Sequence, residues 1–329
     1  MSKGDMRLIA SDAERAPIHV GFLLVPGFAL LPFASAIEPL RAANQLSGRS
    51  LYRWSHISLD GEPPRASSGI VVAHDAQVGE DGDYDYVFVC AGGNPARFRD
   101  RRAFAWLRRL ARRGARLGGV SGGPYILARA GLLDGYRFTV HWEHAAALIE
   151  EFPRLDLRRS LFEIDRDRLT CGGGTAPLDM LHRLIAAEHG AALATEVSEW
   201  FLQTQVRDGA EPQRMALRER LGVAHAPLLL VIDRMERALE TPCTRAQLAA
   251  AARLSVRQLE RLFRRHLGRS LGEHYMTLRL GRARDLLRQT TMSVLDVALA
   301  CGFASASHFS RCYAKQFGHP PRAERMRRK

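Results

Sequence analysis

The last third of the chain repeats one pattern of helices and turns, and this repeat constrains the fold more than any other feature. Each unit is a short helix, a tight turn and a second helix that follows a serine suited to an N-cap, Ser255 in the first unit and Ser305 in the second. The expected helices cover 227–239, 245–252, 256–266, 271–288, 294–300 and 306–317. The pattern predicts an all-α domain with two helix-turn-helix units joined by the long helix.

The second helix of each unit has an apolar face and a polar face. Leu259, Leu262 and Phe263 are spaced to pack inward in the first unit, as are Phe309, Tyr313 and Phe317 in the second. Because the second helix of such a unit enters the major groove, the polar residues at the N-caps and on the outer faces are the candidate DNA contacts. They are Ser255, Arg257, Gln258, Glu260, Arg261 and Arg265 in the first unit, and Ser305, Ser307, Ser310 and Arg311 in the second.

The excess positive charge lies on this same segment. Residues 225–329 contain 20 Lys and Arg against 8 Asp and Glu, whereas residues 1–224 are close to neutral. A basic domain joined to a neutral one favours a polyanion partner for the basic part, which we expect to be double-stranded promoter DNA. A solvated basic surface is the alternative interpretation.

Residues 17–206 alternate short apolar runs with helical patterns. Strands are expected at 18–25, 52–59, 70–73, 86–90, 117–120 and 168–171, with helices at 36–46, 103–113, 125–130 and 177–189. This alternation predicts an α/β domain with a mostly parallel sheet and helices on both faces. A flexible tail over 1–16 and a polar linker over 207–224 complete the expected organisation.

In such a fold ligands bind outside the carboxyl ends of the strands. Ser121 lies on a strand-to-helix turn, and His141 with its neighbours follows an apolar run over 138–140. The candidate ligand-binding residues at these ends are Phe28, Gly93, Asn94, Ser121, Gly122, His141, Trp142 and Glu143. The glycines of 172–174 match neither phosphate-loop pattern and are expected to allow a tight crossing near the crevice.

Other classes of site are not indicated. The five cysteines form no CxxC pair, which gives no zinc site or disulfide framework and suits a reducing cytoplasm. His141 and His144 are one helical turn apart, but further metal ligands are not evident, so neither a metal nor another cofactor is expected. The uncharged run over 20–37 contains Pro26, Gly27 and Pro32, which makes a membrane span improbable.

The α/β part resembles the class I glutamine amidotransferase-like proteins of the PfpI type. The resemblance rests on the Ala-Gly-Gly loop at 91–93, the elbow at Ser121 and the Thr-Val-His run at 139–141. Enzymes of that family have a cysteine at the elbow and a histidine partner downstream. Here the elbow residue is Ser121, and residues 29–33 lack the acidic residue that many relatives carry. The resemblance therefore implies a retained pocket without catalysis, while a hydrolase or amidase using Ser121 and His141 stays the alternative.

The helical part resembles the AraC-type DNA-binding domain. The segment DVALACGFASASHFSRCYAKQFGHPPRAER matches the pattern of that family almost throughout, and the resemblance covers about a hundred residues. By matching residues, the base-reading positions of the family fall on Arg257, Glu260 and Arg261 in the first unit. In the second unit they fall on Ala306, Ser307, Ser310 and Arg311, of which Ala306 has no polar group.

Together the two parts look like the AraC-type regulators that carry a PfpI-like ligand domain. The stretches VSGGPYILARAGLLDGY and HWEH are similar to members that respond to glycine betaine, carnitine and related amines. This resemblance implies a cytoplasmic homodimer that activates catabolic genes through RNA polymerase when a small inducer binds. A quaternary or methylated amine would suit an aromatic face such as that of Trp142. A nucleoid-type DNA binder without a ligand is a further alternative.

Overall fold

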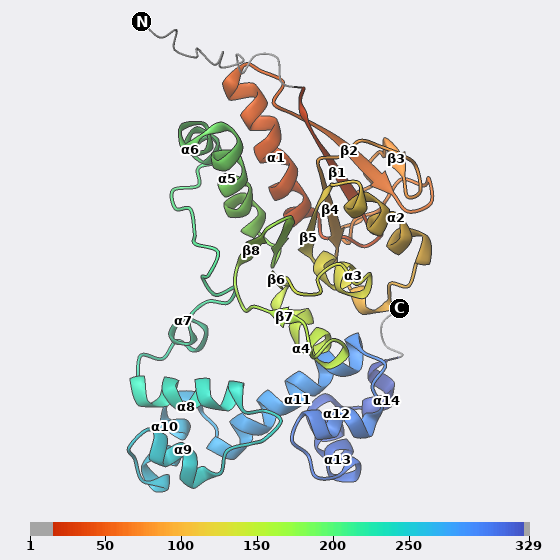
Figure 1. Cartoon of the computed structure of the whole chain (residues 1–329). Helices are drawn as coiled ribbons and strands as arrows, with labels where there is room; N and C mark the ends of the chain where they lie inside the picture. The colour runs from red at the N-terminus through yellow and green to blue at the C-terminus, as the bar shows by residue number, and fades with distance from the viewer. Residues whose placement is uncertain (1–15, 326–329) are drawn as a thin grey trace, which may run out of the picture.

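The computed structural model describes residues 16–325 as an α/β part and a helical part that lie against each other (Figure 1). Of the tail expected over 1–16, residues 1–15 lie outside the described range. None of the helices within that range is both long and apolar enough to cross a membrane. The fold class predicted from the sequence is confirmed.

The α/β part is built on a seven-stranded sheet in the order β3-β2-β1-β4-β5-β9-β8. Neighbouring strands run parallel except at the β8–β9 pair, which is an antiparallel hairpin. The strands are β1 (Ile18–Leu24), β2 (Tyr52–Ser58), β3 (Ala76–Gln77), β4 (Tyr86–Ala91), β5 (Arg116–Ser121), β8 (Phe162–Asp165) and β9 (Arg168–Cys171). A separate parallel pair is formed by β6 (Arg137–Phe138) and β7 (Asp156–Leu157).

Helices cover both faces of the sheet, and each face has its own hydrophobic core. One core lies under α1 (Leu30–Ser47), α5 (Ala176–His189) and α6 (Ala191–Trp200). The other lies under α2 (Arg101–Arg112), α3 (Gly123–Arg129) and α4 (Trp142–Glu151), with the short 3-10 turn η2 (Pro95–Arg97) beside α3. The central strands β1 and β4 are buried almost throughout, which explains why they appear in the sequence as continuous apolar runs.

Two sequence predictions for this part are corrected. Helix α1 begins at Leu30 rather than at 36, because Pro32 falls in the first turn, where its missing N–H is not needed. The strand expected over 70–73 is not formed, and Val71 makes only an isolated bridge to Arg65. Helix α4 begins soon after the apolar run over 138–140, with His141 as its N-cap.

The helical part contains seven helices within the described range. They are α8 (Ala226–Arg237), α9 (Arg245–Ala251), α10 (Val256–Leu267), α11 (Leu271–Gln289), α12 (Val294–Ala300), α13 (Ala306–Phe317) and α14 (Pro321–Glu324). α8 to α10 surround one core with the first half of α11, and α12 to α14 surround a second core with its other half. α11 therefore connects the two helix-turn-helix units, as Figure 1 shows.

The segment between the two parts is structured. It contains the short helix α7 (Leu217–Leu221), whose Leu217 and Leu221 pack against the core of the first helix-turn-helix unit. Arg220 Nη2 lies 2.7 Å from Glu236 Oε1 on α8 and fixes α7 to that helix. The polar stretch predicted as a linker is thus attached at its C-terminal end to the helical part.

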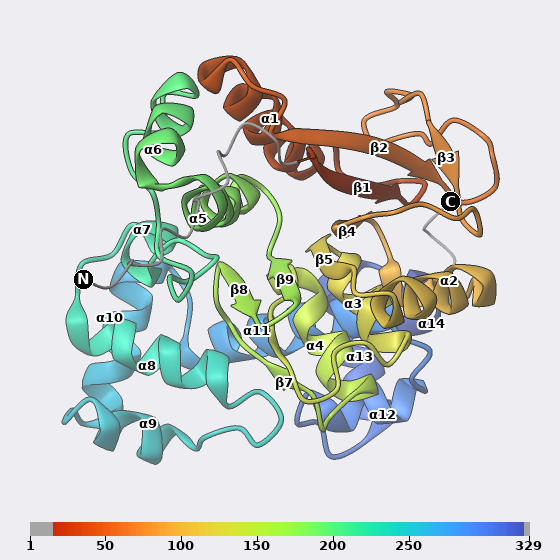
Figure 2. The same cartoon turned by 45° about the horizontal axis from the view of Figure 1, so that its top comes forward.

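The two parts meet mainly where α4 packs against α11, and both views place these helices side by side (Figures 1 and 2). Arg282 Nη2 lies 3.1 Å from Glu150 Oε1, and His144 Nδ1 lies 3.0 Å from Gln289 Oε1. Ala146 packs against the core of the second helix-turn-helix unit. The helix that joins the two units is therefore in direct contact with the α/β part.

Candidate ligand site and nucleic-acid interface

A pocket of about 190 Å³ opens at the carboxyl ends of the sheet strands. It is smaller than the roughly 300–1,000 Å³ typical of sites for drug-sized ligands, so it suits a small metabolite. The residues that line it come from the ends of β6 and β9, the start of α5 and the segment before α7. They are His141, Trp142, Leu161, Gly172, Gly173, Gly174, Thr175, Ala176, Arg207 and Gln213.

His141 and Trp142 belong to the predicted ligand set, and the structure brings both to this pocket. Their position follows from the end of β6, because His141 is the N-cap of α4 and Trp142 its first residue. Burial lowers the pKa of His141, and the nearby Glu143 carboxylate opposes that shift. The indole of Trp142 is 46% exposed, which leaves much of the ring open to solvent.

Gln213 lines one side of the pocket, although it is 71 residues after Trp142 in the sequence. Its Oε1 accepts a hydrogen bond from the Trp142 backbone N–H at 2.8 Å. Its Nε2 donates to the carbonyl oxygens of Val140 and Ser160 at 2.9 and 2.7 Å. Gly172 leaves the space for this side chain, because a Cβ at that position would lie 2.5 Å from Gln213 Cδ.

Arg207 contributes a second side of the pocket and is held by the buried carboxylate of Asp179. Its Nε and Nη2 lie 3.0 and 2.6 Å from Asp179 Oδ2, and Nη2 also donates to Thr175 Oγ1 at 2.9 Å. Asp179 has no exposed surface, so a charged partner is needed to compensate for its burial. The ion pair fixes the beginning of the linker onto α5.

The open face of Trp142 is in contact with a cation from the chain itself. The guanidinium carbon of Arg214 lies 4.9 Å from the centre of the Trp142 ring, within the range of a cation–π interaction. Burial lowers the pKa of Arg214, assisted by the neighbouring charge of Arg220, while Glu236 and Asp285 act in the opposite direction. The sequence prediction that this face attracts cations therefore has a physical counterpart in the structure.

The other predicted ligand residues lie around the pocket rather than among its lining residues. The Cβ of Ser121 lies close under Gly173, and Gly122 donates its N–H to Ala91. Gly93 has φ +61°, and its neighbour Asn94 donates Nδ2 to the Arg288 carbonyl of α11 at 2.6 Å. The Phe28 ring has no exposed surface and packs edge-on against Phe33, which is the environment of a core residue.

Glu143 is on the first turn of α4, with Oε2 3.9 Å from His141 Nδ1. Its charge also acts on Asp285 of α11 and raises the pKa of that carboxyl, whose burial is the larger cause. Its position therefore connects the pocket rim to the contact between the two parts.

Ser121 keeps the backbone geometry of an elbow. Its φ is +61°, a region that non-glycine residues rarely adopt, and such strain is found where a fold positions a functional side chain. The hydrogen bonds recorded for Ser121 in the described range use its backbone, for example from His141 N–H to Ser121 O at 3.1 Å. The side chain is 8% exposed and is not joined there to a histidine ring that would act as a base.

A cysteine close by does not replace the missing nucleophile. Cys171 is fully buried at the end of β9, and burial raises the pKa of its thiol to about 12. A thiol of this kind is not ionised near neutral pH and is a poor nucleophile. Among residues 16–325, no cluster of three or more His, Cys, Asp or Glu side chains is arranged to hold a metal ion.

The polar residues of α10 divide into two groups. Ser255 and Gln258 form a capping box, in which each side chain accepts a hydrogen bond from the backbone of the other. Glu260 Oε2 accepts from the Leu271 N–H at 3.2 Å and so supports the start of α11. Arg257, Arg261 and Arg265 are exposed and are the side chains of α10 best placed to reach DNA.

In α13 the same division holds. Ser305 is the N-cap and accepts a hydrogen bond from the His308 N–H at 3.3 Å. Ser307 and Arg311 are exposed and Ser310 is half-buried, whereas Phe309 and Tyr313 are fully buried as predicted. The bounds of α12 and α13 agree with the sequence prediction at every end.

Comparison with known proteins matches each of the two parts to a protein family. Residues 20–186 match the DJ-1/PfpI family, and residues 248–327 match a helix-turn-helix domain. The HTH-type transcriptional regulator GbdR of Pseudomonas aeruginosa is 48% identical over 313 residues, which cover 95% of this chain and 85% of that relative. The chain is an AraC-type transcriptional regulator with a DJ-1/PfpI-family N-terminal domain.

Other relatives of this AraC-type regulator share the arrangement. The HTH-type transcriptional regulator GlxA of Rhizobium meliloti is 45% identical over 321 residues, covering 97% of this chain and 99% of that relative. Among solved structures, an AraC family transcriptional regulator from Pseudomonas putida is 28% identical with a TM-score of 0.51. It covers 56% of this chain and 100% of its own.

Sequence reasoning missed several pocket residues of this regulator. Arg207 and Gln213 were assigned to a polar linker, and the glycines at 172–174 to a tight crossing. Only the hydrogen bonds of Gln213 to residues of the β6–α4 connection place it in the pocket. Gln213 is 73 residues from Val140, and no local pattern in the sequence marks a contact of that separation.

Proposed function

We propose that this regulator responds to a small cationic metabolite, of the quaternary or methylated amine class, that binds at the pocket beside Trp142. The observation that carries the proposal is the Arg214 guanidinium lying 4.9 Å from the centre of the Trp142 ring. An aromatic face that accepts a guanidinium also suits an alkylated ammonium, since both are attracted by the ring quadrupole. The resemblance to regulators of glycine betaine and carnitine catabolism supports the same class.

In the same proposal the protein acts as a cytoplasmic homodimer that activates transcription through RNA polymerase. Arg257, Arg261, Ser307 and Arg311 contact bases, and Arg265 contacts phosphate. The exposure of these five side chains supports the assignment, and so does their position on the second helix of each unit. Gln258 and Glu260 have structural roles at helix starts, so we propose that their contribution to DNA binding is indirect.

We further propose that the α/β part is a sensor and not an enzyme. Support comes from the serine at the elbow, the absence of an acidic residue over 29–33 and the unreactive environment of Cys171. A hydrolase would need Ser121 to be activated by a base that an acidic residue orients. Turnover of an ester or amide that is lost in Ser121→Ala would contradict this proposal.

A thermal-shift screen of the full chain tests the inducer class. Glycine betaine, carnitine and tetramethylammonium are compared with glycine, which carries no alkylated ammonium. A ligand present at 100 times its Kd adds about 2.7 kcal/mol to the free energy of unfolding, which raises Tm by several degrees. The shift is expected for the alkylated amines and is expected to be lost in Trp142→Ala. An equal response to glycine, or none to the amines, would reject the class.

A further inference from the structure

The linker places a cation of the chain on the aromatic face that the proposed function assigns to the inducer. We propose that Arg214 is an internal occupant of the cation site on Trp142, and that a cationic inducer acts by displacing it and so releasing the linker. The inference rests on the proposed function and extends it to a mechanism of regulation. It assigns a binding role to the junction between the two parts, where Arg214 lies over the ring of the pocket residue Trp142.

Burial and the neighbouring charge of Arg220 lower the pKa of Arg214, and two carboxylates partly offset them. Glu236 of α8 and Asp285 of α11 both stabilise the charged form of Arg214 by their electrostatic influence. Asp285 in turn faces Glu143, which adjoins Trp142 in the sequence. An alkylated ammonium carries the same charge as the guanidinium, so the Trp142 ring face attracts it for the same reason. Trp142 is 46% exposed, so an external ligand has access to the ring.

The neighbour of Arg214 attaches the same segment to the pocket. Gln213 lines the pocket, and its side-chain amide bonds to the β6–α4 connection and to the carbonyl of Ser160. A ligand that enters the pocket beside Trp142 therefore meets Gln213, and a ligand on the ring face meets Arg214. Because Arg214 and an inducer compete for one ring face, binding of the inducer removes one of the two attachments of this segment.

The consequence reaches the first helix-turn-helix unit through α7. Residue 214 is three positions before Leu217, the first residue of α7, and α7 is fixed to α8 by the Arg220–Glu236 ion pair. Val223, just after α7, is buried in the core of the first unit. The second unit is held independently by the α4–α11 contact. Loss of the Arg214 contact thus loosens the connection between the α/β part and the first unit.

Calorimetric titration of the full chain with tetramethylammonium chloride tests the competition. Arg214→Ala is expected to lower the Kd of this probe about two- to fivefold, which corresponds to the strength of an exposed cation–π contact. Arg214→Lys keeps a cation and is expected to stay near the wild-type Kd. Arg183→Ala is the matched control, because it removes an exposed ion pair to Asp208 of the same linker away from Trp142.

Limited digestion with trypsin provides a second measurement. Without the probe, cleavage after Arg218 in α7 is expected to be faster in Arg214→Ala than in the wild type. The rate in this unliganded variant is expected to approach that of the wild type saturated with the probe. An unchanged or weaker affinity in Arg214→Ala overturns the competition. Absence of probe binding in every variant overturns the cation site as a whole. Binding of promoter DNA by the same samples separately tests the regulator function.

Discussion

Arg261 and Arg265 are both exposed on α10, but they lie at different distances from its N-terminal end, the end that contacts base edges in helix-turn-helix proteins. Arg261 is within the second turn, where a side chain reaches base edges and an arginine grips guanine with two hydrogen bonds. Arg261→Ala should therefore weaken operator binding by roughly 1–3 kcal/mol more than it weakens binding to scrambled DNA. Glu260 does not neutralise it, because that carboxylate lies against Arg245 and the Leu271 N–H.

Arg265→Ala is the matched variant for this prediction. It is expected to weaken operator and scrambled DNA about equally and to reduce the salt slope by about one unit, as loss of a phosphate contact does. Both variants are titrated against both duplexes at several salt concentrations. If Arg261→Ala lowers the two affinities by the same factor, then Arg261 does not read a base.

Gly172 offers a test of the pocket wall at the same scale. An added Cβ would meet the end of the Gln213 side chain at 2.5 Å, and that side chain is free to rotate away without moving the backbone. Gly172→Ala is therefore expected to fold but to lose the Gln213 hydrogen bonds. Each lost bond lowers the free energy of unfolding by about 1 kcal/mol. Cleavage by trypsin after Arg218 should become faster. Gly281→Ala, on α11 with no atom near the added Cβ, should leave that rate unchanged.

At the scale of the element, a buried carboxylate holds the second helix-turn-helix unit together. Glu324 of α14 accepts hydrogen bonds from Tyr313 of α13 and from Arg284 and Arg288 of α11. Burial alone would raise the pKa of Glu324, but these hydrogen bonds lower it to about 2 from the ordinary 4.5. The contribution to stability is complete above pH 4.5 and is lost as the pH falls toward 2.

Glu324→Gln is expected to lower the free energy of unfolding by about 2–3 kcal/mol at pH 7, since two arginines lose their charged partner. The effect should shrink as the pH falls toward 2, because the wild-type carboxyl is then protonated as well. Chemical denaturation from pH 3 to pH 7 measures both quantities. A loss of stability that does not vary over this range would mean that the charge of Glu324 is not what stabilises the unit.

The helices of these two units were predictable because their signals are local. Serine N-caps, apolar positions three and four residues apart, and Gly318 after α13 mark α12 and α13 without reference to the rest of the fold. Helix α4 lacks such signals, since its N-cap is His141 and it follows an apolar run. The hairpin of β8 and β9 is short and turns at Arg166, which has φ +57°. A glycine at that position would have indicated the turn in the sequence, and the chain has an arginine there.

The residues of the candidate site were predictable from the sequence only where they follow the end of a strand. Strand ends are visible in the sequence, and His141 and Trp142, which follow one of them, both line the pocket, while their role in ligand binding stays a prediction. Arg207 and Gln213 reach the pocket only after the chain has passed through α5 and α6. Phe28 also follows a strand end, but an aromatic residue there is equally suited to the core, and its ring has no exposed surface.

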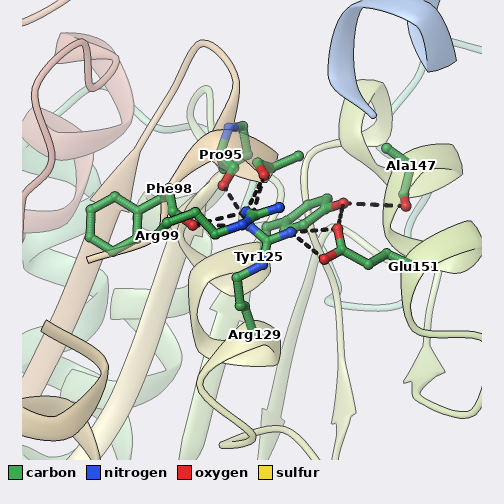
Figure 3. A network of polar contacts seen from close by, with 8 residues as sticks. Pro95, Phe98, Arg99, Tyr125, Arg129, Ala147 and Glu151 are labelled. Carbon is green, nitrogen blue, oxygen red and sulfur yellow. Dashed lines mark hydrogen bonds and ion pairs between the residues drawn. The ribbon is translucent and has the colours of Figure 1, made fainter. Parts of the chain in front are cut away.

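At the scale of the whole molecule, helix α4 connects the pocket, the sheet and the helical part. Its N-terminal end is at the pocket, and its middle packs on α11. Its last turn is fixed by the network in Figure 3, where Glu151 pairs with Arg129 and accepts a hydrogen bond from Tyr125. Arg129 also donates to the carbonyls of Ala96 and Phe98 beside η2. With its C-terminal end fixed in this way, α4 is in contact with the pocket at one end and with α11 along its middle.

The contact between the two parts should itself depend on pH. Asp285 of α11 is at this interface, and burial, together with the like charge of Glu143, raises its pKa to about 6 despite Arg288, Arg284 and Arg214 nearby. The form in which α4 packs on α11 therefore binds a proton at Asp285 more tightly than a form in which the two helices are apart. Its stabilisation is complete below the ordinary pKa of 3.8 and is lost as the pH rises through 6.

Small-angle X-ray scattering of the full chain between pH 5 and pH 8 measures this dependence. The radius of gyration of the wild type should increase with pH as ionised Asp285 weakens the α4–α11 contact by up to about 3 kcal/mol. Asp285→Asn removes the ionisation and should keep the radius constant over that range. Asp233→Asn, on α8 in an exposed pair with Arg237, is the matched control and should behave as the wild type. A radius that rises equally in Asp285→Asn would assign the pH dependence to another group, of which His141 at the start of α4 is the nearest to the pocket.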